Sequence, residues 1–96
     1  DLLRLDLKDM QTLLRRIDKA SLSIALKGAG DEVKGHFFKS MSERAGAILR
    51  DDMEILGAVR LRDIDAAQAK IMETARALAD QGEIYLSKNP AEEVVL

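Results

Sequence analysis

The stretch from Ser42 to Asp63, SERAGAILRDDMEILGAVRLRD, carries nine charged side chains among its 22 residues within an apolar pattern of helical period. At about 100° per residue, five apolar residues fall on one face of a helix. They are Ala45, Ile48, Leu49, Met53 and Leu56. Ser42 is suited to cap this helix and Gly57 to end it. The stretch therefore predicts a helix with one face in the core and charges on its other faces.

Apolar residues recur with the same period in the rest of the chain. Upstream, four of them are spaced i, i+3, i+4 and i+7: Met10, Leu13, Leu14 and Ile17. Downstream, a second set with helical spacing comprises Ile64, Ala67, Ile71, Ala75 and Leu78. Between the two lie two shorter inward-facing sets, Leu22, Ala25 and Leu26, then Val33, Phe37 and Met41. The segment EIYL at 83–86 has local strand character but is too short to make a sheet.

Capping residues divide this pattern into helices. Asp6 and Asp18 are suited to cap two helix starts, Gly28 and Gly30 to mark a stop and a new start, and Gly82 to close the final helix. The apolar turn of Leu2, Leu3 and Leu5 counts as the first helix. The sequence thus predicts an all-α, compact six-helix domain over residues 1–86. Residues 87–96, which contain the sole Pro, are expected to form a flexible tail.

Composition excludes several classes of protein. The chain has 96 residues, 47% hydrophobic and 33% charged, with a net charge of -2. Such a balance favours a helical globule and lacks the basic footprint of a nucleic-acid partner. The absence of Cys excludes disulfides and thiolate metal sites and agrees with a cytosolic setting. No apolar run approaches the ~20 residues of a transmembrane helix. Because residue 1 is not Met, we expect the sequence to begin inside a longer protein.

The sequence offers little for catalysis, a metal or a cofactor. His36 is the sole histidine, so neither a Ser-His-acid triad nor a His-based metal site is available. Asp51 and Asp52 are adjacent, and neighbours on a helix point about 100° apart, so the two carboxylates do not converge on one bond. The glycine-rich segment KGAGDEVKG, 27–35, lacks the Walker spacing and follows a helix. We expect no enzyme activity and no cofactor.

The charges of the quoted stretch are more informative. Arg44 and Asp51 are seven residues apart and fall on nearly the same line along one flank of the helix. Arg44 lies in the first turn, where the helix dipole disfavours a cation. Arg50 and Glu54 are expected to form a solvated i,i+4 pair on the opposite side.

Asp52 falls within the apolar arc of the same helix, where a lone buried carboxylate is costly. We therefore expect a cationic partner for it. Lys27, Arg60 and Arg62 are the candidates that the sequence offers.

Four collinear segments resemble the C-terminal domain of the bacterial flagellar motor switch protein FliG. They are IALKGAGDEV (24–33), MSERA (41–45), ILRDDMEILGAVRLRD (48–63) and AQAKI (67–71). The similarity runs in register from DLLRLD to GEIYL. The resemblance implies a six-helix C-terminal rotor subdomain of a protein built of armadillo-like helical domains, facing the cytoplasmic loop of the stator protein MotA. By position, it implies stator-interaction and torque roles for five residues: Lys27, Arg44, Asp51, Asp52 and Arg60.

The resemblance also implies partners and a location. They are FliM, neighbouring FliG copies, and the membrane ring protein FliF through domains that this chain lacks, on the cytoplasmic side of the inner membrane in the flagellar basal body. One departure concerns the turn after the charged helix. The family often has Gly-Pro-Val-Arg where this chain has Gly57-Ala58-Val59-Arg60, so we expect a freer turn and a less fixed Arg60.

Two other readings of the residues stay open. In the first, the chain is a generic helical protein-protein adaptor with a charged binding face. In the second, it is a small enzyme or nucleotide-binding domain, which predicts a deep pocket at the Gly28–Gly30 turn.

Overall fold

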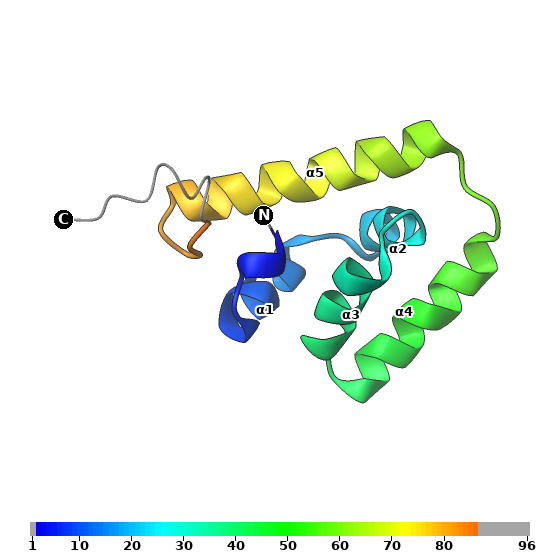
Figure 1. The fold of residues 1–96 in the computed structure, drawn as a ribbon, viewed down its shortest axis with the longest axis horizontal. Helices are drawn as coiled ribbons and strands as arrows, with labels where there is room; N and C mark the ends of the chain where they lie inside the picture. Colours follow the sequence, from blue (N-terminus) through cyan, green and yellow to red (C-terminus); the bar gives the residue numbers. More distant parts are fainter. Residues whose placement is uncertain (1, 87–96) are drawn as a thin grey trace.

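The computed structural model describes residues 2–86, and all regular structure in that range is helical (Figure 1). A 3-10 turn, η1 (Leu2–Arg4), precedes α1 (Leu7–Arg16), α2 (Lys19–Lys27), α3 (Asp31–Lys39), α4 (Glu43–Leu56) and α5 (Leu61–Asp80). The all-α prediction is confirmed. The count of six helices is corrected to five α-helices and one 3-10 turn, because the short segment before Asp6 closes only a single turn. The predicted tail, 87–96, lies outside the described residues.

Side-chain caps set the starts of three helices where the sequence predicts them. Asp6 accepts a hydrogen bond from the backbone N–H of Asp9 at 2.8 Å, and Asp18 accepts one from Ser21 at 2.9 Å. The hydroxyl of Ser42 accepts the backbone N–H of Ala45 at 3.1 Å. Each cap satisfies one of the N–H groups that have no partner inside the helix.

Gly82 ends the long helix α5 through its backbone conformation. With φ of 76°, it occupies the left-handed region that favours glycine. Its N–H donates to the carbonyl of Ala79 at 3.0 Å, and the N–H of Glu83 donates to that of Leu78 at 2.9 Å. This pair of bonds is a Schellman motif. It turns the chain back so that Ile84, which has 6% of its surface exposed, packs into the core.

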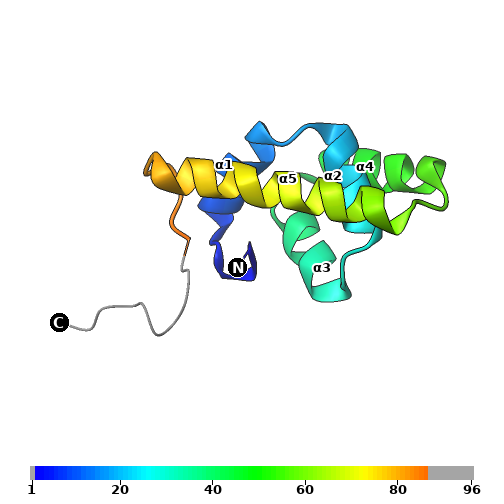
Figure 2. The same ribbon diagram turned by 90° about the horizontal axis from the view of Figure 1, so that it is seen from above.

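Helix α2 lies between α4 and α5 and packs against both (Figure 1). Figure 2, seen from above, shows α5 running across α1 and α2, and α5 contacts both. The buried core draws on all of the helical segments from α1 to α5 and on the residues that flank them. It comprises Leu5, Met10, Leu13, Leu22, Ala25, Leu26, Phe37, Leu49, Ala67, Ile71, Ala75, Leu78 and Ile84.

A close approach between helices fixes the identity of Gly28, the C-cap of α2. A Cβ added at Gly28 would overlap Cγ2 of Ile64 on α5. The Ile64 side chain branches at Cβ and has little rotamer freedom in a helix, so it cannot move aside easily. Gly28 therefore sets how closely the end of α2 approaches α5.

We predict that Gly28→Ala lowers the free energy of unfolding by about 1–3 kcal/mol, through overpacking against Ile64. The matched control is Gly35→Ala in the middle of α3, where nothing lies within 4 Å of an added Cβ. That variant should gain about 0.5–1 kcal/mol, because alanine favours a helix interior. Urea denaturation followed by circular dichroism measures both. Equal stabilities for the two variants would contradict the prediction.

Asp18 also links α2 to α5, because its second carboxylate oxygen lies 2.9 Å from Nζ of Lys70. The backbone N–H of Ser21 and then the Lys70 ammonium group hold the pKa of Asp18 well below its ordinary value of 3.8. The charged form is thus favoured by folding. Its contribution to stability is fully present above pH 3.8 and is lost as the pH falls from there toward the lower pKa of the folded state.

We therefore predict that wild type is more stable than Asp18→Asn at pH 6, and that the difference shrinks below pH 3.8. Asparagine keeps the cap but loses the charge that attracts Lys70. Urea midpoints measured from pH 6 to pH 2.5 give the comparison. A gap that stays constant over this range would show that the charge of Asp18 has no part in stability.

Candidate functional site

The five residues singled out from the sequence lie on three helical elements. Lys27 is the last residue of α2, and Arg44, Asp51 and Asp52 lie on α4. Arg60 is the N-cap of α5. Arg44, Asp51 and Arg60 are exposed, whereas Lys27 and Asp52 are half-buried. The set therefore divides into three outward charges and two that contact the protein itself.

Arg44 and Asp51 share one flank of α4, as the helical wheel predicts. Seven residues at 1.5 Å rise separate them by about 10 Å along the helix axis. The two turns between them are regular α-helix, so their spacing is fixed by the backbone. Opposite charges at this distance can each contact a separate group of a partner.

None of the five residues takes part in an ion pair within residues 2–86. The two salt bridges found there join Arg16 to Glu83 at 3.4 Å and Lys70 to Asp18 at 2.9 Å. Both link elements that are distant in sequence and so serve the fold. Arg44, Asp51 and Arg60, which are exposed, therefore remain available to another molecule.

The ion pair expected for Asp52 is not formed, and this prediction is wrong. Neither Lys27, Arg60 nor Arg62 lies within salt-bridge distance of it in the described part of the chain. Asp52 is only half-buried, so water can solvate its carboxylate without a cationic partner. It lines a small pocket between α2 and α4, and the cation on the same pocket is Lys19.

The apolar face of α4 is covered less completely than the wheel predicts. Leu49 is buried and Ala45 and Met53 are half-buried, but Ile48 and Leu56 are 44% and 39% exposed. The reason is the position of α4 at the outside of the bundle, where α2 is its main neighbour (Figure 1). One helix covers a narrower arc than the wheel assigns to the core.

Arg50 also differs from expectation. Its guanidinium carbon lies 4.6 Å from the centre of the Phe38 ring, over the ring face. Glu54 is not its salt-bridge partner in the described structure. A cation over an aromatic face is stabilising, and here it joins α4 to α3.

The turn before Arg60 has Ala58 where the resemblance predicts proline. Gly57 adopts φ of 61° and its N–H donates to the carbonyl of Glu54 at 3.1 Å. The carbonyl of Arg60 then accepts the N–H of Asp63 at 3.0 Å and of Ile64 at 3.1 Å, which starts α5. These bonds place the Arg60 backbone at the start of α5, and the freer turn expected from the missing proline stays a prediction.

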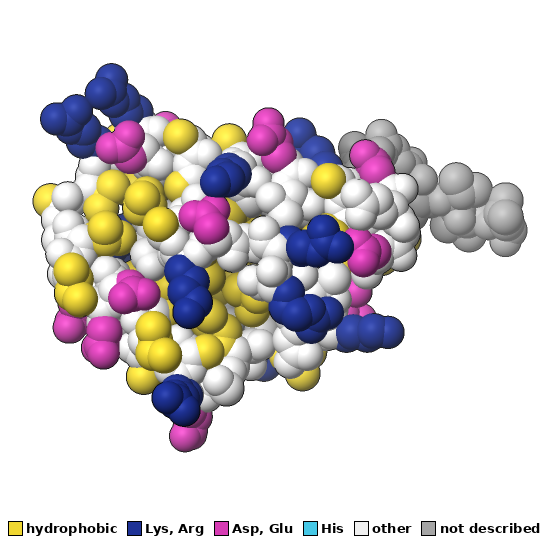
Figure 3. All heavy atoms as spheres, turned by 180° about the vertical axis from the view of Figure 1, so that it is seen from behind, with side chains coloured by type: hydrophobic (Ala, Val, Ile, Leu, Met, Phe, Trp, Pro, Cys, Tyr) yellow, Lys and Arg dark blue, Asp and Glu magenta, His cyan; other side chains and the backbone are white. Residues whose placement is uncertain are grey.

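Figure 3 shows the charge distribution on one face of the molecule. Basic and acidic side chains are interspersed there around areas of exposed apolar side chains. Neither sign dominates this face, in agreement with the net charge of -2. A surface of this kind favours a partner with charges of both signs over a uniformly charged polymer.

The features that suggested chemistry have structural explanations. His36 is half-buried, and its Nε2 lies 2.9 Å from the carbonyl oxygen of Leu5, so the ring ties α3 to the N-terminal segment. A cavity of about 370 Å³ does lie beside Gly28 and Gly30, but its walls are mainly apolar and include no Lys or Arg among the described residues. It lacks the cationic groups that hold a nucleotide phosphate. Among residues 2–86, no cluster of acidic or histidine side chains is placed to hold a metal ion.

Comparison with known proteins now identifies the family. The model of the FliG C-terminal domain matches residues 1–86. The chain belongs to this family. The flagellar motor switch protein FliG of Thermotoga maritima is 45% identical over 96 residues, which is 100% of this chain and 29% of that protein. FliG of Bradyrhizobium diazoefficiens is 50% identical over 93 residues, 97% of this chain and 28% of that protein. The chain thus spans less than a third of these relatives.

Solved structures agree with the FliG assignment. The crystal structure of FliG residues 86–343 from H. pylori superposes with a TM-score of 0.86 at 36% identity. The alignment covers 90% of this chain and 41% of that one. The fold and the family are therefore those that the collinear segments indicate. No helix in residues 2–86 has both the length and the apolar character needed to cross a membrane.

Sequence reasoning missed the apolar members of the exposed flank of α4. Ile48 is 44% exposed and Ile55 is 82% exposed. The signal was present in the wheel, because Ile48 falls only about 40° and Ile55 about 20° from Arg44. The wheel placed Ile48 at the edge of the apolar face, and Ile55 was assigned to neither face.

We predict that Asp52→Asn changes the free energy of unfolding by no more than about 0.5 kcal/mol, since no ion pair is lost. Asp51→Asn, an exposed neighbour, is the matched control and should behave alike. Breaking a buried ion pair would instead cost about 3–5 kcal/mol. Thermal unfolding at pH 7 separates the two cases, and a loss of that size in Asp52→Asn alone would restore the buried-pair interpretation.

Proposed function

We propose that this domain is the stator-facing part of a flagellar rotor, and that Arg44 and Asp51 are its principal contacts. The observation that carries the proposal is that both side chains are exposed and unpaired within residues 2–86. Two findings support the proposal. The chain belongs to the FliG C-terminal domain family, and the relatives that it matches are flagellar motor switch proteins. The proposed partner is the cytoplasmic loop of the stator protein MotA.

The physical character of the contacts suits a rotor. Exposed ion pairs are worth about 0–1 kcal/mol each and are screened beyond about 8 Å at physiological salt. Such contacts can guide a passing partner into register and then release it. In the proposed mechanism Arg44 and Asp51 engage stator charges of opposite sign, and Arg60 contributes a third exposed charge at the α5 start.

Lys27 and Asp52 have a supporting part in the proposal. Both are half-buried, Lys27 at the end of α2 and Asp52 between α4 and α2. They contribute to the local potential and to the shape of the surface, while the exposed charges make the direct contacts. The role is one of binding and force transmission and requires no catalysis or cofactor.

The proposal extends to switching. The five residues lie on α2, α4 and α5, and α2 packs against both other helices, so they move as one unit. Rotating this unit about a hinge would present the same charges to the stator at another angle and so reverse the rotor between clockwise and counterclockwise rotation. In the whole protein we place the domain in the basal body, on the cytoplasmic side of the inner membrane. There FliM and neighbouring FliG copies are its partners, and FliF is bound through other domains.

Charge reversal tests the assignment. In a motile host whose only copy of the switch protein contains this domain, Arg44→Glu with Asp51→Lys should reduce swimming at least several-fold, while circular dichroism stays unchanged. Reversing the facing charges of the stator loop should restore part of the loss, because the attractive pairs form again.

The matched control reverses Glu73→Lys and Arg76→Glu, an exposed pair on α5. This variant should swim as wild type. Normal swimming of the Arg44 and Asp51 double variant would refute the torque assignment and favour a generic adaptor domain.

A further inference from the structure

The exposed flank of α4 alternates charged and apolar residues. Arg44, Ile48, Asp51 and Ile55 follow one another at spacings of four, three and four, which keeps them on one line of the helix. Arg44 and Asp51 are exposed, and Ile48 and Ile55 are 44% and 82% exposed. The line that carries the proposed stator contacts therefore also presents two large aliphatic side chains to solvent.

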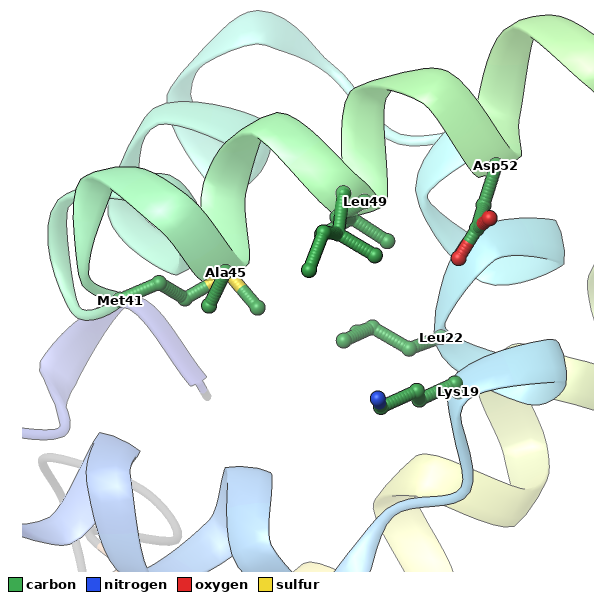
Figure 4. Close-up of a pocket in the computed structure, with 7 residues that line it drawn as sticks. Lys19, Leu22, Met41, Ala45, Leu49 and Asp52 are labelled. Atoms are coloured by element: carbon green, nitrogen blue, oxygen red, sulfur yellow. The ribbon is translucent and has the colours of Figure 1, made fainter.

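A pocket lies beside this line, between α4 and α2 (Figure 4). Its walls are mainly aliphatic, and one of them is the Ile48 side chain. The lining residues are Lys19, Leu22, Met41, Ala45, Ile48, Leu49 and Asp52. The volume is about 110 Å³. An apolar cavity of about 150 Å³ holds a benzene molecule, so this pocket has room for one aliphatic side chain.

The pocket wall carries charged groups of both signs. Asp52 supplies a carboxylate to it, and the exposed Asp51 lies on the adjacent flank of α4. Lys19 is the cation on the pocket wall, and Figure 4 shows its ammonium group directed away from the Asp52 carboxylate. Arg44 is not among the lining residues and lies on the adjacent exposed flank of α4. Because Lys19 and Asp52 are not paired with each other, both charges remain open to a bound partner. The site thus combines apolar walls with one basic and one acidic side chain, next to Arg44 and Asp51 on the exposed flank.

We infer that this pocket receives an aliphatic side chain from an amphipathic helix of the stator loop. The complementary helix presents an acidic residue toward Arg44 and Lys19, an aliphatic residue over Ile48, and a basic residue toward Asp51 and Asp52. To share one face of the partner helix, the acidic, aliphatic and basic residues are separated by about four and three residues along its sequence. This inference rests on the proposed function and adds a determinant to it, a single apolar anchor between the charged contacts.

One anchor of this size fits a contact that is made and released repeatedly. Burying one aliphatic side chain strengthens binding about tenfold or more, far less than a full protein interface supplies. The charged side chains in and beside the pocket orient the partner, and the pocket fixes its register along α4 to within one turn. Charge alone, screened over about 8 Å, does not discriminate positions one helical turn apart as sharply.

Binding of synthetic peptides to the full-length protein tests the inference in vitro. Two helical peptides are compared. One has Glu, Leu and Lys on one helix face in this order from the N-terminus, and the other has them in the reverse order. Each peptide also has a version in which Ser replaces Leu. We expect one Leu peptide to bind about tenfold more tightly than its Ser version. Ala45→Met fills the pocket with its own side chain and should abolish the difference.

The matched control for that variant is Ala69→Met at an exposed position of α5, which should keep the difference. A ratio between Leu and Ser peptides below twofold in wild type would overturn the inference. So would a ratio that persists in Ala45→Met. Thermal unfolding of both variants shows that the fold is retained.

Motor torque measured on tethered beads near stall tests the same point in cells. Ala45→Met and Ile48→Ala should each lower torque at least twofold, whereas Ala69→Met should not. If the charge reversals of Arg44 and Asp51 abolish swimming but the pocket variants keep full torque, the pocket inference fails and the proposed function stands. If the charge reversals also have no effect, the proposed function fails.

Discussion

The burial of α2 between α4 and α5 is the constraint on which the other features depend. α2 is a helix of only nine residues, yet Leu22, Ala25 and Leu26 are buried, and its Ser23 hydroxyl is satisfied by donating to the carbonyl of Lys19 at 3.0 Å. An isolated helix of this length is marginal in water, so its stability comes from the two helices that cover it. The absence of a side chain at Gly28 lets α5 approach closely, and Asp18 adds the cap and the bond to Lys70.

This arrangement leaves α4 at the edge of the bundle, and its position explains the surface. Because α2 is its main neighbour, α4 buries Leu49 but leaves Ile48 and Ile55 in contact with solvent beside Arg44 and Asp51. The internal ion pairs are formed elsewhere, by Asp18 with Lys70 and by Arg16 with Glu83. The fold engages Arg50 of α4, over the Phe38 ring, and leaves Arg44 and Asp51 without an ion pair within residues 2–86. A rigid helix that displays unpaired charges is suited to repeated contact with a moving partner.

The departures from expectation around α4 have one physical origin. Asp52 and Ile48 fall within the apolar arc of the wheel, and both were assigned to the interior on that basis. A wheel gives directions around a helix but not the distance to the next element. The single covering helix reaches Leu49 and leaves a pocket at Asp52 and Ile48, where the carboxylate is only half-buried. Arg50 likewise packs over the ring of Phe38 on α3, a contact that no local sequence pattern indicates.

The sequence by itself determined the helical character, the caps at Asp6, Asp18 and Ser42, the stops at Gly28, Gly57 and Gly82, and the family. These depend on short-range backbone chemistry and on the order of residues along the chain. It also placed Arg44 and Asp51 on one flank, because seven residues make nearly two turns. Only the tertiary structure decided which flank of α4 is covered, which acids are paired and where a pocket remains. Burial and pairing are set by elements that are distant along the chain, and no local spacing encodes how closely those elements approach.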